Sequence, residues 1–330
     1  MAFRPDDPLL AVVSPPRAER FRALAGLAPD DPVTGDFSGW SKLVVLTPRL
    51  AVLFPRDHTM VEPLRREVEA LRAVAPAGLA EVPEVLHVWE EAGISPYPVV
   101  ALRRLPGVVL EGLLPELDVE ALGHVVAQLG RLTARWHAAP PEPLAARPPR
   151  DLPHRRTLDR LLGARPGAPD APDAVGRVCR ALGIPRDDEA RVLAAVRRVR
   201  ALPRVIAHGD VHEGQVLVDP ADGLRVTGVL DWQTATVDHP FSDFDFGEWG
   251  PTFWRRHRAA LPALRRLWWD AYAAARGLPG DLAAAFEWVW AASHAMWRQE
   301  EPAASDAEVT GTSEDAAALA RQAARALARG

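Results

Sequence analysis

An aspartate, a glutamine and a second aspartate follow apolar runs in the second half of the chain, at Asp210, Gln215 and Asp231. The turn signal Asp222-Gly223 predicts a hairpin that folds the 21-residue separation between the two aspartates back on itself. We therefore expect the three side chains to face one cavity. Phosphoryl transfer uses such a set, because one carboxylate orients the attacking hydroxyl group while a second carboxylate and an amide oxygen hold Mg²⁺ on the nucleotide phosphates.

The segment His208-Gly209-Asp210, followed by Gln215 and Asp231 at these spacings, resembles the pattern of the aminoglycoside phosphotransferase and choline-kinase-like family. Members of this family are small-molecule kinases with a protein-kinase-like fold. The resemblance implies that Asp210 is the catalytic base, that Gln215 and Asp231 are the metal ligands, and that His208 organises the loop. The sequence of residues 227–244 is also similar to that of the macrolide phosphotransferase branch.

The resemblance covers about residues 34–300 and implies supporting roles for further residues. Asp243 matches a buried aspartate that supports the catalytic loop, and Glu67 matches a helical glutamate that pairs with a cation on the third strand. The match includes Leu105-Pro106-Gly107 at the predicted hinge and Trp136-His137 at the end of a helix.

Two positions depart from the family pattern. Gln215 stands where the family has an asparagine, and Leu53 stands where the third strand of the family carries the Lys or Arg that contacts phosphate. A hairpin centred on Thr47-Pro48 predicts that Lys42 lies directly opposite Leu53, with both side chains on one side of the sheet. Lys42 is the single lysine among 39 Lys and Arg residues, and we expect it to supply the missing cation. Arg56 is the rival cation, and an exposed strand lysine is the alternative.

Apolar periodicity divides the chain into two parts that meet at Leu105-Pro106-Gly107. The expected fold is α+β, a two-lobed protein-kinase-like fold. Residues 1–104 are predicted to form an N-terminal nucleotide-binding lobe with a small antiparallel sheet, and residues 105–330 a mostly helical C-terminal lobe for catalysis and substrate binding. The predicted helices include 16–28, 61–74, 119–136 and 187–200, the predicted strands are 41–46, 49–54, 85–89, 99–102, 205–207, 216–218 and 225–230, and residues 34–40 are predicted as a loop.

The composition is that of a globular protein, with 48% hydrophobic and 25% charged residues among 330. The net charge of −5 gives no reason to expect a nucleic-acid or membrane-surface partner. The single cysteine, Cys179, excludes a disulfide framework and a cysteine-based zinc site. No apolar run approaches the ~18 residues of a membrane-spanning helix, and the acidic N-terminus is unlike a signal peptide. We therefore expect a cytoplasmic protein.

These observations predict a small-molecule kinase that uses Mg²⁺ and transfers the γ-phosphoryl group of ATP or GTP to a hydroxyl group of an antibiotic, a related natural product or a metabolite. Leu53 leaves open a nucleotide-binding pseudokinase scaffold. The alternation of His208, Asp210 and His212 leaves open a metal-dependent hydrolase, although no second cluster with ligand spacing occurs in the sequence.

The sequence says less about the acceptor substrate. Eight of the eleven tryptophans follow residue 230, and we expect most of them in the core and one or two in the wall of a pocket for a bulky, partly apolar acceptor. A polycationic aminoglycoside would instead need carboxylates, for which Asp245, Glu248 and Glu300-Glu301 are the late candidates. Near the motif, His212 and Glu213 are predicted to lie on the loop surface.

Overall fold

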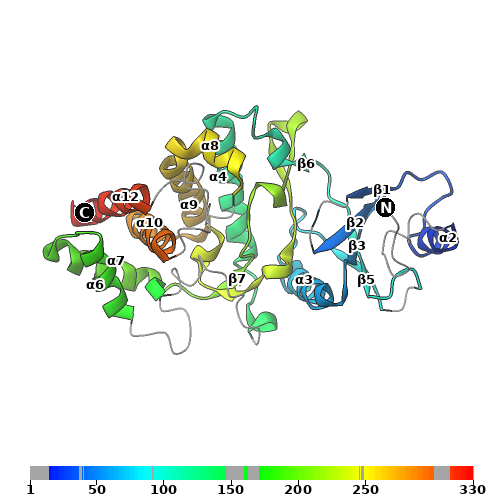
Figure 1. Ribbon diagram of the computed structural model, residues 1–330, viewed down its shortest axis with the longest axis horizontal. Coiled ribbons are helices and arrows are strands. Elements are labelled where there is room, and N and C mark those ends of the chain that lie inside the picture. Colours follow the sequence, from blue (N-terminus) through cyan, green and yellow to red (C-terminus); the bar gives the residue numbers. More distant parts are fainter. Residues whose placement is uncertain are drawn as a thin grey trace.

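The computed structural model describes residues 15–36, 39, 41–90, 93–145, 160–162, 171–244, 246, 249–300 and 313–329. The molecule is elongated, with the N-terminal sheet near one end and the helices α10 (Leu282–Glu300) and α12 (Ser313–Arg329) near the other (Figure 1). The fold class is α+β, with an antiparallel-sheet N-terminal lobe and a helical C-terminal part, as the sequence predicted.

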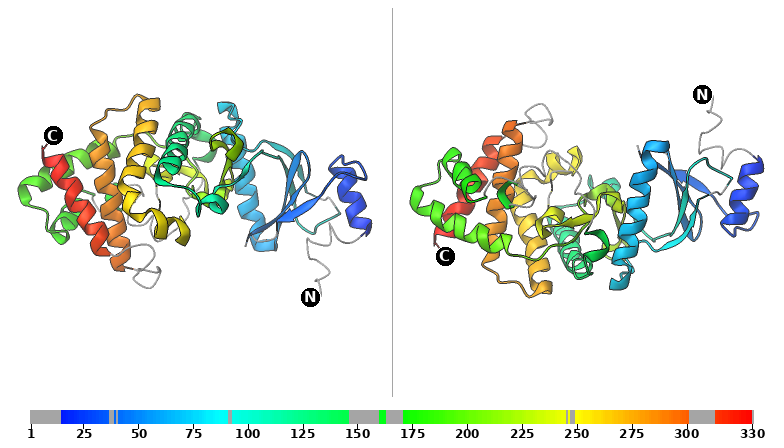
Figure 2. Two further views of the ribbon diagram at one scale, coloured as in Figure 1. Left: turned by 90° about the horizontal axis from the view of Figure 1, so that it is seen from above. Right: turned by 90° about the horizontal axis from the view of Figure 1, so that it is seen from below.

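Five antiparallel strands form the N-terminal sheet in the order β1-β2-β3-β5-β4. Two helices cover its opposite faces (Figure 2). Phe21 of the first helix, α2, shares a buried cluster with Val52, whereas Leu64 of the second helix, α3, shares another with Leu53. The elements are α2 (Pro15–Leu24), β1 (Thr34–Asp36), β2 (Lys42–Leu46), β3 (Leu50–Pro55), α3 (Val61–Val74), β4 (Val85–Trp89) and β5 (Val99–Arg103).

The β2–β3 hairpin has a different register from the predicted one. Thr47 closes a longer turn, because its N–H donates to the carbonyl of Leu50 at 2.9 Å and its Oγ1 accepts the N–H of Leu50 at 2.9 Å. Lys42 consequently lies opposite Pro55, and the prediction that it lies opposite Leu53 is wrong. Because side chains alternate along a strand and the shift is two residues, Lys42 still faces the same side of the sheet as Leu53.

Two further predictions at the N-terminus differ from the structure. Residues 34–40 were expected as a loop, but Thr34–Asp36 pair with β2 as a short edge strand. The first helix ends at Leu24 and not near residue 28, because Gly26 adopts a φ of 60°, which is incompatible with a continuing helix. The other predicted helices and strands named above agree with the structure to within about two residues at each end.

The connection between the sheet and the C-terminal part depends on Gly107. Its φ is 110°, and a Cβ at this position would lie 2.4 Å from Thr227 Oγ1 and 2.7 Å from the carbonyl oxygen of Val218, so only glycine fits. Immediately after it, β6 (Val108–Val109) pairs with β8 (Val216–Asp219), which in turn pairs with β9 (Arg225–Val229). Another pair joins β7 (Val205–Ala207) to β10 (Thr236–Asp238).

In the C-terminal part, α4 (Val119–Trp136) packs against α9 (Leu261–Arg276), whereas α12 packs against α10 (Figure 1). Asp118 caps α4 by accepting the N–H of Ala121 at 2.8 Å. The two helices approach closely at Gly130, where a Cβ would lie 2.3 Å from the carbonyl oxygen of Trp268. The other helices are α6 (Ala171–Ala181), α7 (Arg186–Arg200) and α8 (Pro251–His257).

The late tryptophans form much of the core, as predicted. They are at most 5% exposed at residues 232, 249, 254, 268, 269, 288 and 290. Phe244 lies among them, with ring centroids 5.4 Å from Trp268 and 5.7 Å from Trp269. None of the described helices, the aromatic α10 included, is long and apolar enough to cross a membrane.

Candidate active site

A buried carboxylate fixes the backbone of the loop that carries Asp210. This loop directly follows β7, and Asp243 accepts hydrogen bonds from the backbone N–H groups of His208 at 2.9 Å and Gly209 at 2.6 Å. Gly209 has a φ of 78°, which places it in the left-handed region that favours glycine. Hydrogen bonds to the backbone of the two preceding residues therefore fix the position of Asp210 in the loop.

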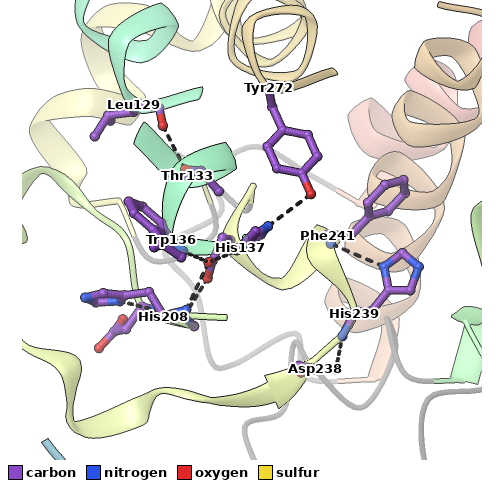
Figure 3. Close-up of polar contacts among 12 residues, drawn as sticks. Leu129, Thr133, Trp136, His137, His208, Asp238, His239, Phe241 and Tyr272 are labelled. Carbon is purple, nitrogen blue, oxygen red and sulfur yellow. Dashed lines mark hydrogen bonds and ion pairs between the residues drawn. The ribbon is translucent and has the colours of Figure 1, made fainter. Parts of the chain in front are cut away.

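Two residues at the end of α4, Trp136 and His137, also bind this carboxylate, and Figure 3 labels both of them. Trp136 Nε1 donates to Asp243 at 3.1 Å, His137 Nε2 lies 2.9 Å from it, and His137 Nδ1 lies 3.1 Å from the hydroxyl of Tyr272. Burial lowers the pKa of His137, so we assign a neutral ring that donates from Nε2 and accepts from Tyr272. Burial alone would raise the pKa of Asp243, but its contacts with His137 lower it, and the group is a carboxylate.

His208 connects the two loops that carry the candidate aspartates. Its Nε2 lies 2.8 Å from the carbonyl oxygen of Leu230, the residue before Asp231, and its Nδ1 accepts the N–H of Asp210 at 3.3 Å. Burial lowers the pKa of His208, so the neutral ring donates from Nε2. Thr234 Oγ1 donates to the carbonyl oxygen of His208 at 2.7 Å. Through these contacts, His208 joins the loop of Asp210 to the loop of Asp231.

A third buried histidine, His239, gives the stability of this region a testable pH dependence. Its Nε2 lies 2.9 Å from the carbonyl oxygen of Val199, and its Nδ1 accepts the N–H of Phe241 at 3.2 Å (Figure 3). Burial lowers its pKa to about 4. The residue is therefore neutral in the folded protein, whereas in the unfolded chain it takes up a proton below about pH 6.5. We expect its contribution to folding stability to be complete above that pH and to fall by about 2 kcal/mol by about pH 5.

Urea unfolding near pH 7 and near pH 5 measures this effect. The variant His239→Gln retains an amide that can donate and accept but cannot titrate, so its loss of stability on acidification should be smaller than that of the wild type by about 2 kcal/mol. The remaining loss includes the contributions of His137 and His208, whose pKa values burial also lowers. Equal losses in the variant and the wild type would contradict the prediction.

Lys42 lies between two carboxylates that come from different elements. Its Nζ is 2.8 Å from Asp231 Oδ1 and also donates a hydrogen bond to Glu67 Oε2 on α3. Glu67 Oε1 accepts the backbone N–H of Trp232 at 3.3 Å, which joins α3 to the loop after β9. Burial by itself lowers the pKa of Lys42, but Glu67 and Asp231 together raise it above its usual value. The cation that pairs with Glu67 thus comes from β2 and not from β3.

Asp231 is an ionised group in an uncommon backbone conformation. Its φ of 63° and ψ of 64° lie in the left-handed region, which few residues other than glycine adopt. Burial would raise its pKa, but the Lys42 ammonium lowers it below the usual value. Gln215 Nε2 donates to Asp231 Oδ2 at 3.2 Å, so the two side chains that the sequence paired do meet. Such local strain is typical of functional sites.

A cavity of about 710 Å³ lies between the sheet and the C-terminal part and brings these groups together. Its polar side chains include Lys42, Asp210, Gln215 and Asp231. Its apolar wall is built from both lobes by residues that include Val44, Ala51, Leu53, Leu102, Leu105 and Leu217. The volume and the mixture of an apolar wall with a few converging polar groups are typical of a small-molecule site.

The rival cation Arg56 lies outside this cavity, and the acidic candidates for the acceptor side cannot be placed in it. The side chain of Arg56 is exposed, its Nε donates to the carbonyl oxygen of Gly39 at 2.6 Å, and it does not line this cavity. Among the acidic candidates for the acceptor side, Asp245, Glu248 and Glu301 lie outside the described residues, as does the side chain of Glu300 at the end of α10.

Glu213 is buried next to the site, at a position that the sequence did not predict. The prediction of a surface position is wrong, because the residue is 1% exposed and its Oε1 accepts the N–H of Gly250 at 2.5 Å. Burial raises its pKa. The contact ties the loop that follows Asp210 to the start of α8, and no local sequence signal predicts it because the two residues lie 37 positions apart. Its neighbour His212 is half-buried and lines the cavity.

The two histidines near Asp210 are engaged in hydrogen bonds to the backbone. His208 contacts Leu230 and Asp210 as described, and His212 Nδ1 accepts the N–H of Gly214 at 3.1 Å. Within the described parts of the chain, no three His, Cys, Asp or Glu side chains are grouped so that they could hold a metal ion. The described residues therefore contain no group of ligands that would support the alternative of a metal-dependent hydrolase.

Comparison with known proteins points to one family and one fold. A family model described as "Phosphotransferase enzyme family" matches residues 32–279. The solved GDP complex of wild-type aminoglycoside 2'-phosphotransferase-IIIa has a TM-score of 0.50 at 13% sequence identity, over 94% of this chain and 97% of that chain. The ternary complex of APH(2")-IIa with streptomycin and ATP has a TM-score of 0.52 at 12% identity, over 92% and 98%.

A further solved structure, the apoenzyme of macrolide 2'-phosphotransferase MphH from Brachybacterium faecium, is 22% identical with a TM-score of 0.49, over 91% of this chain and 95% of that chain. A search of curated proteins found no match.

Proposed function

Because the chain belongs to the phosphotransferase enzyme family, we propose that it is a small-molecule kinase that transfers the γ-phosphoryl group of ATP or GTP to a hydroxyl group. The convergence of Lys42, Asp210, Gln215 and Asp231 on one cavity carries this proposal. We place the boundary between the lobes at Leu105, so that residues 1–104 contribute mainly to nucleotide binding and residues 105–330 carry the catalytic loop and the acceptor site.

The chemistry of Asp231 and Gln215 fits Mg²⁺. A carboxylate and a side-chain amide supply hard oxygen ligands, and Mg²⁺ takes few protein ligands when phosphates complete its coordination. The lowered pKa keeps Asp231 ionised, and Gln215 already lies beside it. Both residues would hold the ion through their oxygen atoms, and bound Mg²⁺ neutralises charge on the nucleotide phosphates.

Lys42 has the position and the charge to contact the nucleotide phosphates. Its ammonium is held by Glu67 and Asp231 at the wall of the cavity, and its raised pKa keeps it charged. Glu67 positions the ammonium from α3. A cation fixed in this way needs little reorganisation when the anionic phosphates bind, which favours electrostatic stabilisation of the transferring group.

Asp210 acts on the acceptor. Its carboxylate orients the attacking hydroxyl group and accepts its proton as the bond to phosphorus forms. Asp243 and His208 hold the backbone of this loop, because Asp243 accepts the N–H groups of His208 and Gly209 and His208 accepts the N–H of Asp210. The roles of the two candidate aspartates are thus distinct, because Asp210 serves the acceptor and Asp231 serves the nucleotide.

Substitutions of Gln215 test its role as a ligand. Gln215→Asn retains the amide oxygen and should keep activity, whereas Gln215→Leu should weaken Mg²⁺-dependent nucleotide binding by at least about 10-fold to 100-fold, the range seen when even an outer partner of a metal is removed. Calorimetric titration with ADP at several Mg²⁺ concentrations measures the effect. Asp231→Ala serves as the reference for complete loss of Mg²⁺-dependent nucleotide binding. If Gln215→Leu binds ADP as tightly as the wild type does, Gln215 is not a ligand.

A mass-shift screen tests the proposed function as a whole. The enzyme is incubated with Mg²⁺, either ATP or GTP, and a panel of hydroxyl-bearing antibiotics and metabolites, and a gain of one phosphoryl group is scored. The panel includes streptomycin, because a fold neighbour is described in complex with streptomycin and ATP, and bulky, partly apolar natural products. Nucleotide binding with neither transfer nor hydrolysis would favour the pseudokinase scaffold.

A further inference from the structure

His212 is a side chain of the nucleotide cavity to which the proposed function assigns no role. It lies on the loop between Asp210 and Gln215, and all three residues line the cavity. The residues on either side of His212 are buried instead, because Val211 is 4% exposed and Glu213 is 1% exposed. His212 therefore borders the space between the candidate base and the candidate metal ligands.

The backbone of this loop fixes the imidazole ring of His212. Its Nδ1 accepts the N–H of Gly214 at 3.1 Å. A Cβ at Gly214 would lie 2.8 Å from the Cε1 atom of the ring, so the glycine lets the ring lie this close to the backbone. Because Nδ1 accepts a hydrogen bond, the neutral ring carries its proton on Nε2. The ring thus has a defined orientation and one N–H group to donate.

The Nε2–H group of His212 is available to a ligand. It has no acceptor within the parts of the chain that the structure describes, and the Nε2 atom is accessible on a side chain that is 26% exposed. Other donors on the cavity wall are already engaged. Lys42 pairs with two carboxylates, and the amides of Gln215 and Gln233 donate to Asp231 Oδ2 at 3.2 Å and 3.4 Å.

A carboxyl oxygen behind the ring favours donation to an anion. Glu213 Oε2 lies 3.8 Å from His212 Nδ1 and is buried without a hydrogen-bond partner among the described residues. The other oxygen of Glu213 is held by the N–H of Gly250, so the group has a fixed position. Negative charge density near Nδ1 stabilises positive charge on the ring, and Nε2–H is consequently a stronger donor to phosphate oxygens.

We propose that His212 Nε2 donates a hydrogen bond to an oxygen of the γ-phosphoryl group and thereby holds this group between the nucleotide and Asp210. The inference rests on the proposed kinase function and adds a residue that contacts the transferring group. During transfer, the acceptor oxygen bonds to phosphorus while the bond from phosphorus to the nucleoside diphosphate oxygen breaks, the hydroxyl proton passes to Asp210, and His212 keeps its proton. A preorganised donor at this point stabilises the charge that the phosphoryl oxygens carry in the transition state.

Two substitutions separate the donor of this ring from its acceptor. His212→Asn keeps an oxygen that can accept the N–H of Gly214, as Asn side chains do two residues ahead in Asx turns, but it removes the N–H group at the Nε2 position. His212→Gln has a longer stem, which lets an amide N–H reach the Nε2 position. The Asn variant should therefore keep the structure of the loop, and the Gln variant should keep the contact with phosphate.

Calorimetric titration in the presence of Mg²⁺ measures the contact without catalysis. ADP ends at the β-phosphate, whereas the imido analogue AMP-PNP carries a γ-phosphate group. We expect His212→Asn to weaken the binding of AMP-PNP by about 10-fold to 100-fold, the range for a hydrogen bond to a charged group, and to leave ADP binding within about twofold of the wild type. His212→Gln should retain most of the affinity for AMP-PNP. GDP and GMP-PNP replace this pair if the protein prefers guanine nucleotides.

His124→Asn is the matched control, because this histidine is exposed on α4 and does not line the cavity. It should bind both nucleotides like the wild type. If His212→Asn weakens the binding of ADP and AMP-PNP equally, or weakens neither, the contact with the γ-phosphoryl group is wrong.

Steady-state kinetics with an acceptor from the mass-shift screen separate a phosphate contact from an acceptor contact. The proposal predicts that His212→Asn lowers kcat/KM for the nucleotide by about 10²-fold to 10³-fold, the effect of removing one preorganised donor, and leaves the KM for the acceptor unchanged. A raised KM for the acceptor with an unchanged kcat/KM for the nucleotide would overturn it.

The same measurements distinguish failure of this inference from failure of the kinase function. If the wild type transfers phosphate but His212→Asn binds both nucleotides like the wild type, the kinase function stands and the role of His212 is wrong. If His212→Asn loses affinity for AMP-PNP alone but the wild type phosphorylates no compound, the kinase function fails and the phosphate contact stands.

Discussion

Replacing Asp210 with asparagine should lower kcat by about 10²-fold to 10⁴-fold, the range for loss of a general base. The amide has nearly the size of the carboxylate, so the loop held by Asp243 and His208 should keep its structure. Nucleotide affinity should change little, because Asp231, Gln215 and Lys42 remain in place. The measurement is a steady-state assay with the acceptor from the mass-shift screen, together with a calorimetric titration of ADP.

Asp187→Asn is the matched control, because this aspartate lies exposed in the first turn of α7, away from the site. It should leave both kcat and nucleotide affinity unchanged. Turnover of Asp210→Asn within a few-fold of the wild type would remove Asp210 from the mechanism. A variant that also lost nucleotide binding would instead assign Asp210 to the metal or the phosphates.

Lys42→Met should lower kcat/KM for the nucleotide by about 10²-fold to 10³-fold, the effect of removing one preorganised charged donor. The substitution also leaves Glu67 buried without its cation, so part of the loss should come from displacement of α3. The comparison of Lys42→Arg with Lys42→Met tests whether charge alone suffices, since the planar guanidinium is larger than the ammonium.

Two further variants separate Lys42 from the other candidate cations. Arg56→Met should have a small effect, because Arg56 is exposed outside the cavity. The exchange Lys42→Leu with Leu53→Lys moves the ammonium to the strand position that the family uses and should restore part of the activity, because both side chains face the cavity. If Lys42→Met is fully active, the phosphates need no lysine partner, and the assignment of Lys42 to the phosphates is wrong.

The sequence predicted the side of the sheet on which Lys42 lies but not its partner in the hairpin. Side chains alternate between the two faces of a sheet along a strand, and this alternation determines the face on which Lys42 lies. The register of the hairpin depends instead on the length of the turn. The turn was expected to contain Thr47-Pro48 alone. It is longer because the Thr47 side chain accepts the N–H of Leu50. A register shift of two residues leaves the Lys42 side chain on the same face of the sheet. Lys42 therefore contacts Glu67 even though its predicted partner in the hairpin was wrong.

Long-range contacts account for what the sequence did not predict. Glu213 was expected at the surface because it lies in a polar loop, but its carboxylate is buried by its hydrogen bond to Gly250. The contact of Tyr272 with His137 also joins residues 135 positions apart. Periodicity, caps and turn signals report on neighbours in the chain, and only the resemblance to a family pointed to a distant partner such as Asp243.

The single lysine of the chain is a natural spectroscopic reporter on the candidate phosphate site. Growth with ¹⁵N-labelled lysine places an isotope on one side chain only, so that one Nζ resonance arises from the whole protein. That ammonium is held between Glu67 and Asp231, and its protons should exchange slowly enough with water to be observed. Its chemical shift would then follow the arrival of ATP, of GTP or of Mg²⁺ separately, without any engineered probe.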